Sequence, residues 1–153
     1  AKITVENSAS YTIESRRTGT GNEGHAVFRN ANGAVGSIFT NGSATSYNTS
    51  SDYRLKENLV TDWDATTRLK QLNPLRFNFI TDADTTVDGF LAHEVQEIVP
   101  EAITGSKDAV DADGNPKYQG IDQSKLVPLL VKAMQEQQAL IESLTARITT
   151  LEG

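Results

Sequence analysis

The chain has 153 residues, no cysteine, a net charge of −6 and a modest 37% of apolar residues. The lack of cysteine excludes disulfides and thiolate metal sites, and the acidic charge argues against nucleic acid as a partner. No stretch approaches the roughly 18 apolar residues of a membrane helix, so we expect no membrane insertion. The first residues do not resemble a signal peptide, and Ala1 reads as the middle of a longer chain.

Residues 1–50 lack leucine and proline, are rich in Gly, Asn, Ser and Thr, and carry a net charge of +1 against −7 for residues 51–153. Asn32-Gly33 and Asn41-Gly42 are typical of tight turns between strands. So few apolar residues cannot close a core within one chain. The pattern favours an intertwined β-structure shared by several chains, with a flexible linker as the alternative. The predicted strand runs are Ile3–Val5, Tyr11–Ile13, Ala26–Phe28 and Val35–Phe39.

Residues 51–121 have the composition of a small α+β domain. Their apolar residues form short runs that are bounded by capping residues, prolines and polar loops. The predicted elements are a helix capped by Asp64 that ends before Pro74, a strand at Leu75–Phe79, a polar turn at Thr81–Asp88, a second short strand at Gly89–Ala92, a helix at His93–Val99 ended by Pro100, and a turn at Asp111–Pro116.

A heptad pattern runs from about Ser124 to Glu152 and predicts one long helix within residues 122–153. Asp122 or Ser124 serves as its cap, and Pro128 falls near the first turn, where proline costs least. A helix of about 43 Å is longer than a small domain needs, so we expect it to pack against copies of itself. A helix lying across its own domain is the alternative. The expected seam is Val127, Leu130, Met134, Gln137, Ile141, Leu144, Ile148 and Leu151.

The junction between the two halves reads Ser-Asp-Tyr-Arg-Leu-Lys-Glu-Asn at residues 51–58. This motif resembles the signature of the self-cleaving intramolecular chaperone domains that end phage endosialidases, tail fibres and neck appendages. A related domain occurs in a eukaryotic membrane-bound transcription factor. His93 departs from the glutamine that is commoner in the family. The resemblance extends over Asn73–Phe77, Gly89–Gln96, Pro100-Glu101 and Leu126–Leu130, and the lead-in segment Gly42–Ser50 also matches.

The resemblance implies a Ser–Lys dyad, with Ser51 as nucleophile and Lys56 as general base, that cuts the bond between Ser50 and Ser51 once. A serine hydroxyl needs such a base, and a lysine serves only when its pKa falls towards neutrality. We give Arg54 as the neighbouring cation that lowers this pKa. Asp52 or Glu57 is expected to orient the lysine.

The spacing of five residues places Ser51 and Lys56 about 140° apart on a helix and on opposite faces of a strand. They meet only if the chain bends between them or if the lysine comes from a neighbouring subunit. Either route makes cleavage depend on folding or assembly, and we favour assembly.

The resemblance further implies a homotrimer in which residues 1–50 form the distal end of a tail fibre and residues 51–153 form the chaperone. The expected fold is therefore an intertwined β-structure, a small α+β core at 51–121 and a coiled-coil-like helix at 122–153. The upstream fibre chain is the expected partner, together with a host receptor for the mature fibre. The fibre belongs to the virion, whereas the chaperone folds in the host cytoplasm and is released.

Two other functions stay open. The first is a trimerisation cap that never cuts, and the second is a receptor- or glycan-binding tip that uses Tyr11, Phe28, Phe39 and Tyr47. We expect no metal and no cofactor. His25 and His93 are isolated, and the loop around Asp111 lacks the carboxylates that a calcium loop needs at its first and twelfth positions.

Overall fold

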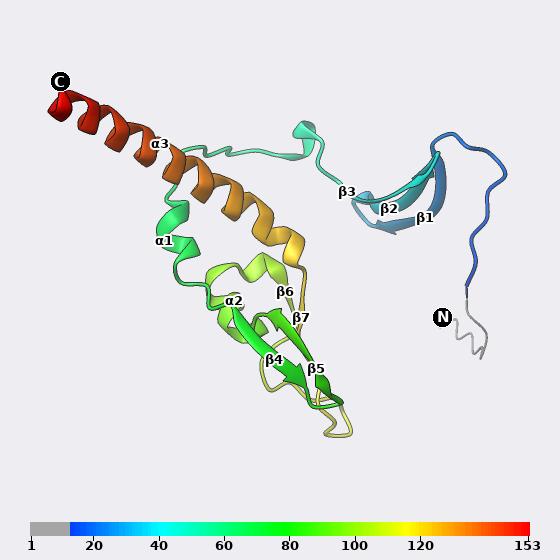
Figure 1. Cartoon of the computed structure of the whole chain (residues 1–153). Helices are drawn as coiled ribbons and strands as arrows, with labels where there is room; N and C mark the ends of the chain where they lie inside the picture. Colours follow the sequence, from blue (N-terminus) through cyan, green and yellow to red (C-terminus); the bar gives the residue numbers. More distant parts are fainter. Residues whose placement is uncertain (1–12) are drawn as a thin grey trace. The chain divides into compact units, whose positions relative to one another are not determined.

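The computed structural model describes residues 13–153, which divide into two compact units at Leu59 and Val60 (Figure 1). The strand predicted at Ile3–Val5 and most of that at Tyr11–Ile13 lie outside the described residues. The division falls after the 50/51 boundary expected from composition, and each unit is described by itself.

The first unit contains one antiparallel sheet in the order β1-β2-β3. Two tight turns fall at the predicted Asn32-Gly33 and Asn41-Gly42, with the loops Ala31-Asn32 and Gly42-Ser43. Gly33 and Gly42 adopt φ angles of 100° and 58° that favour glycine. Both turns and the two inner strand runs are confirmed, whereas the third strand was not predicted because Tyr47 is its only large apolar residue. The strands are β1 (Glu23–Asn30), β2 (Gly33–Asn41) and β3 (Ala44–Thr49).

No side chain of residues 13–59 is fully buried. Val27 and Phe28 are neighbours on β1, so they point to opposite faces of the sheet, and each is more than half exposed. Tyr47 on β3 is exposed as well. The sheet therefore has apolar side chains on both faces and no core within one chain.

The second unit has a small core between three helices, α1 (Ala65–Leu69), α2 (Ala92–Ile98) and α3 (Val127–Glu152). Asp64 caps α1 by accepting from the amide of Thr67, as predicted. The fully buried side chains are Ala65, Val95, Val99, Ala102, Leu126, Leu129 and Ala133.

Polar contacts fix α1 against its neighbours. The carboxylate of Glu136 on α3 accepts from the amides of Ala65 and Thr66 at 3.0 and 2.8 Å, and from the Thr66 hydroxyl at 2.6 Å. Arg68 donates to the carbonyl of Ile98 at 2.9 Å. These bonds satisfy the free amides at the start of α1, so the first half of α3 is held firmly on the core.

A β-hairpin replaces the polar turn and the short strand that the sequence favoured after Leu75–Phe79. The strand β4 (Leu75–Phe79) is confirmed, but its partner β5 (Asp82–Gly89) occupies the predicted turn, and the prediction of a strand at Gly89–Ala92 is wrong. The physical reason is pairing across the hairpin. Arg76 forms an ion pair with Asp88 at 2.7 Å, so a polar strand is stabilised without burial.

Two shorter features complete the second unit. A 3-10 helix, η2 (Pro100–Ala102), follows α2 at the predicted proline, and β6 (Ile103–Thr104) pairs with β7 (Gly120–Ile121). The turn predicted at Asp111–Pro116 is confirmed. The carboxylate of Asp111 accepts from the amides of Asp113 and Asn115, each at 2.9 Å.

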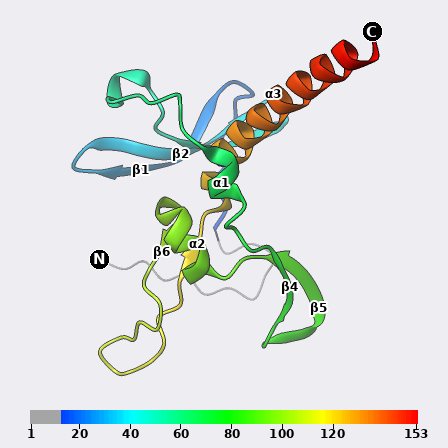
Figure 2. The same cartoon turned by 90° about the vertical axis from the view of Figure 1, so that its left-hand side faces the viewer.

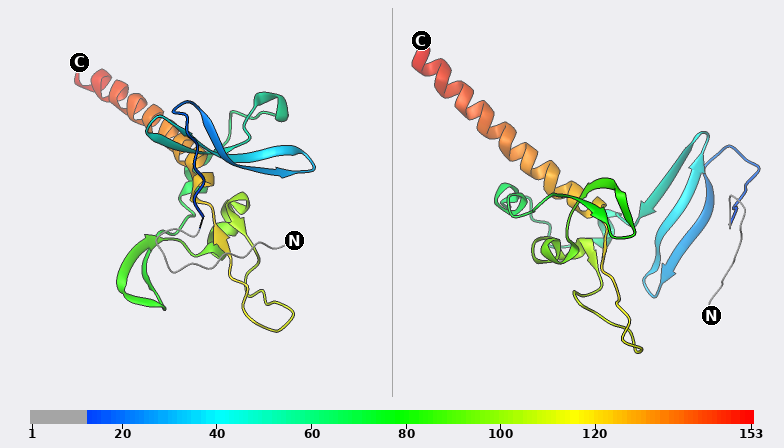
Figure 3. Two further views of the ribbon diagram at one scale, coloured as in Figure 1. Left: turned by 90° about the vertical axis from the view of Figure 1, so that its right-hand side faces the viewer. Right: turned by 60° about the horizontal axis from the view of Figure 1, so that its bottom comes forward.

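The long helix begins after a 3-10 turn, η3 (Gln123–Leu126), which Asp122 caps, and Pro128 stands in its first turn as predicted. Leu129 and Ala133 pack on the core, but every residue from 137 onward is exposed. Figures 2 and 3 show this second half of α3 extending away from α1 and α2.

Candidate active site

The side chains of Ser51 and Lys56 meet within a single chain. Lys56 Nζ donates a hydrogen bond to Ser51 Oγ at 2.8 Å. Between them lies a short 3-10 helix, η1 (Tyr53–Leu55). The contact is thus made by a bend of the backbone, the first of the two routes that the spacing left open.

The bend is a single turn between two extended residues. Asp52 and Lys56 both have extended backbone torsions, with φ and ψ of −62° and 137° and of −124° and 138°. The amides of Leu55 and Lys56 donate to the carbonyls of Asp52 and Tyr53, each at 3.1 Å. This turn brings together two side chains that a continuous strand would hold on opposite faces.

Asp52 and Arg54 bind each other on the turn between Ser51 and Lys56. The Asp52 carboxylate accepts from the amide and Nε of Arg54, each at 2.9 Å, and from Nη2 at 2.8 Å. Arg54 therefore lowers the pKa of Asp52 below its ordinary value, chiefly through the guanidinium bonds and then through the amide. Across residues 13–153, no hydrogen bond or ion pair joins Lys56 to Asp52, Arg54 or Glu57 in the single chain, so their expected effects on the lysine stay predictions.

Ser50, on the other side of the expected scissile bond, is fixed to the sheet. Its amide donates to the carbonyl of Val35 at 3.1 Å, and its hydroxyl donates to the carbonyl of Ala34 at 2.9 Å. Ser50 thus continues the pairing of β3 with β2 by one residue. The chain therefore leaves the sheet at the peptide bond between Ser50 and Ser51.

The segment around Ser51 and Lys56 is open to water in the single chain. All residues from 50 to 60 are exposed, including Ser51 and Lys56. Large apolar side chains accompany them, with Tyr53 78% exposed, Leu55 72% and Leu59 75%. Exposed groups of this size are unusual next to one another on a monomeric surface and are typical of contact regions.

The predicted seam of α3 also remains exposed within its own chain. The residues that α3 buries, Leu129 and Ala133, stand one position before the seam residues Leu130 and Met134. One position rotates about 100° around a helix, so the seam and the core contact occupy different faces. All eight seam residues are exposed, namely Val127, Leu130, Met134, Gln137, Ile141, Leu144, Ile148 and Leu151.

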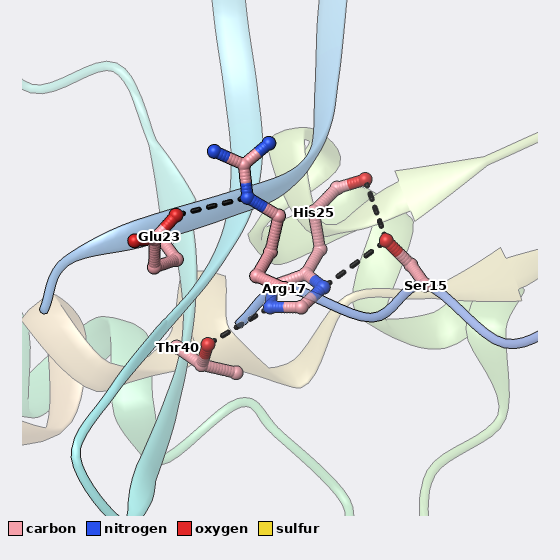
Figure 4. Close-up of polar contacts among 5 residues, drawn as sticks. All are labelled: Ser15, Arg17, Glu23, His25 and Thr40. Carbon is pink, nitrogen blue, oxygen red and sulfur yellow. Dashed lines mark hydrogen bonds and ion pairs between the residues drawn. The ribbon is translucent and has the colours of Figure 1, made fainter. Parts of the chain in front are cut away.

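The two histidines lie in different elements, His25 on β1 and His93 on α2. Figure 4 shows the His25 ring between Ser15 and Thr40, with Nδ1 at 3.1 Å from Ser15 Oγ and Nε2 at 2.8 Å from Thr40 Oγ1. Arg17 and Glu23 form an ion pair beside it at 2.9 Å. These bonds tie the segment before β1 to the sheet. His93 is half-buried at the start of α2.

Within residues 13–153, none of the helices is both long enough and apolar enough to span a membrane.

Residues 51–104 match the Peptidase_S74 family, which is described as chaperone of endosialidase. The match begins at Ser51 and takes in Lys56, α1, the β4–β5 hairpin and α2. The long helix α3 and the sheet of residues 23–49 lie outside it.

Proposed function

We propose that this chain, whose residues 51–104 match the chaperone-of-endosialidase family, ends a phage tail fibre or spike, trimerises and folds it, and then cuts itself between Ser50 and Ser51. The observation that carries the proposal is the 2.8 Å hydrogen bond between Lys56 Nζ and Ser51 Oγ. A nucleophile and its base within hydrogen-bond reach are the minimum that covalent catalysis requires.

The chemistry is an N→O acyl shift followed by hydrolysis. Ser51 Oγ attacks the carbonyl carbon of Ser50 while Lys56 takes the hydroxyl proton, and the amide C–N bond breaks as that proton passes to the departing nitrogen. The product is an ester between the Ser50 carbonyl and Ser51 Oγ. Water then cleaves the ester, which leaves the Ser50 carboxylate, the Ser51 hydroxyl and a free amino group. Each chain reacts once.

Assembly is the trigger that we propose for this step. A lysine in water is protonated at pH 7 and cannot accept the serine proton, whereas burial favours its neutral form. In one chain Lys56 is exposed, together with the apolar Tyr53 and Leu55 that separate it from Ser51. Packing of these side chains in a trimer would desolvate the amine, so cleavage would follow folding.

The proposal of a homotrimer draws support from the exposed apolar surface of both units. The seam of α3 presents seven apolar side chains to solvent, and the alternative of a helix lying across its own domain leaves them unused. The sheet has no buried side chain at all. Both surfaces are stabilised by burial against other copies, and the number three comes from the family resemblance.

The proposed order of events explains why a chaperone would remove itself. Helices that associate first hold three polar fibre strands at high effective concentration and in register, which lowers the entropic cost of winding them together. After cleavage the fibre has lost its template and is trapped kinetically. We place the mature fibre in the virion and the released residues 51–153 outside it.

Wild type and two variants test the proposed cleavage. Wild type, Ser51→Ala and Lys56→Ala are compared by denaturing gel during synthesis, and their trimers are measured by light scattering. We expect a cut only in wild type and trimers in all three. Uncut trimers of every variant would instead support the non-cleaving cap, and cleavage of Lys56→Ala at the wild-type rate would exclude the dyad.

A further inference from the structure

We propose that Asp52 is a positioning residue, whose carboxylate holds the turn that carries Ser51 to Lys56 while Arg54 holds the carboxylate. This inference rests on the proposed function, since it assigns a role within the same cleavage reaction. It replaces the sequence-based expectation that Asp52 orients the lysine directly.

Both oxygens of the carboxylate are occupied. Oδ1 accepts from the Arg54 amide and from Arg54 Nε, each at 2.9 Å, and Oδ2 accepts from Nη2 at 2.8 Å. The bond from the amide is an N-cap, since it satisfies a backbone donor at the start of η1 that has no partner within the turn. The two guanidinium bonds fix the plane of the carboxylate and therefore the direction of the cap.

The turn has little else to hold it. It contains three residues and no buried side chain, and its own backbone supplies two hydrogen bonds at 3.1 Å. Tyr53 and Leu55 are more than 70% exposed, so side-chain packing does not stabilise it in one chain. Short 3-10 segments have poor hydrogen-bond geometry and do not persist by themselves.

Loss of the turn would separate the dyad. Asp52 and Lys56, on either side of η1, are extended, so residues 53–55 alone make the bend, and we infer that without the cap they extend as well. In a strand, residues five apart point to opposite faces, which takes Lys56 Nζ away from Ser51 Oγ. The cap thus acts on the reaction through backbone geometry.

A direct electrostatic action on the lysine has less support. The carboxylate and the guanidinium form a closed pair, so their opposite charges largely cancel at a distance. No hydrogen bond joins either group to Lys56 among the residues that the structure describes. If the cap bond matters, Asp52→Asn should cleave faster than Asp52→Glu. If the negative charge matters, the order of the two cleavage rates should be reversed.

The test compares Asp52→Asn, Asp52→Glu and Asp52→Ala in the full chain. Asparagine has no charge but can still accept through Oδ1 from the Arg54 amide and Nε, losing only the bond from Nη2. It caps as well as aspartate, so we expect its cleavage rate to stay within about threefold of wild type. Glutamate keeps the charge but is a poor cap, and alanine keeps neither. Because small misplacements of reacting groups cost large factors in rate, we expect both to cut about tenfold more slowly or worse.

Two controls keep folding and chemistry apart. Asp62→Ala removes an exposed carboxylate ten residues further along the chain and should cleave like wild type. Each Asp52 variant is also made with Ser51→Ala, and its thermal midpoint and trimer mass should match those of Ser51→Ala alone. If a double variant fails to trimerise, Asp52 acts on folding and the positioning role is wrong.

The outcomes separate the two proposals. If wild type is not cut, the proposed function fails and the positioning role falls with it. If wild type is cut and Asp52→Ala is cut equally fast, only the positioning role fails. A fast Asp52→Glu beside a slow Asp52→Asn would show that the charge matters, and this result also overturns the positioning role.

Discussion

The two units of this chain differ in how many side chains each buries within a single chain. Residues 60–153 bury seven side chains between α1, α2 and α3, and they fasten α1 to α3 through Glu136. Residues 13–59 bury none, although their three strands are fully paired. Hydrogen bonds within a sheet contribute little net free energy without apolar burial. Within one chain, residues 60–153 therefore have a core of their own and residues 13–59 do not.

The largest expected effect comes from separating the two parts. A fragment of residues 51–153 should unfold cooperatively on heating, because it contains the entire core. A fragment of residues 1–50 should show no cooperative transition, because its described residues bury no side chain. Circular dichroism and calorimetry measure both. A cooperative transition in the shorter fragment at monomeric concentration would contradict the claim that it has no core of its own.

The next effect concerns assembly through the seam. Ile141→Asp places a charge in the proposed contact between helices and should convert the trimer to monomers, as measured by light scattering. Ala139→Asp is the matched control, since it adds the same charge two residues away and off the seam. If both variants remain trimeric, the seam is not the contact between copies.

A core substitution sharpens the contrast within α3. Leu129→Ala removes a side chain that is 2% exposed and should lower the free energy of unfolding of residues 60–153 by about 2–5 kcal/mol. Val131→Ala, on the same helix but 49% exposed, should cost much less. Denaturant unfolding in the Ser51→Ala background measures both. Equal losses would show that the core does not lie where the structure puts it.

The smallest effect is a pH dependence. The bonds from Thr66 and Ala65 lower the pKa of Glu136, so its carboxylate stabilises the fold above the ordinary glutamate pKa. This stabilisation is lost as the pH falls through the lowered value of the folded state. Glu136→Gln should therefore be less stable near neutral pH and should lose less stability on acidification. Parallel acid unfolding curves for the two proteins would contradict this account.

The sequence predicts the elements whose signals are local. Asp64, Pro100 and Pro128 mark helix ends, and the heptads mark α3, because caps and periodicity act within a few residues. The strand β5 is not predicted, because its polar residues are stabilised by partners on β4 such as Arg76, and no local sequence pattern shows this pairing.

In the candidate site, too, the sequence predicts some features and misses others. The family motif predicts Ser51 and Lys56, and the spacing leaves two routes, a bend of the chain or a lysine from a neighbouring subunit. The kind of bend depends on Asp52 and Arg54 binding each other, whereas the sequence suggested that each acts on the lysine. The signal was available, because an aspartate two residues before a donor amide is a common N-cap. Partner number and the burial of the dyad depend on other chains, and one sequence does not contain them.

The most direct test of the account is the intact mass of wild type beside Ser51→Ala. We expect two masses from wild type, for residues 1–50 and for residues 51–153 with a free amino group on Ser51, and one mass from Ser51→Ala for all 153 residues. A single full-length mass from trimeric wild type, or a cut at any other bond, would contradict the claim that the Ser51 hydroxyl, served by Lys56, divides this chain.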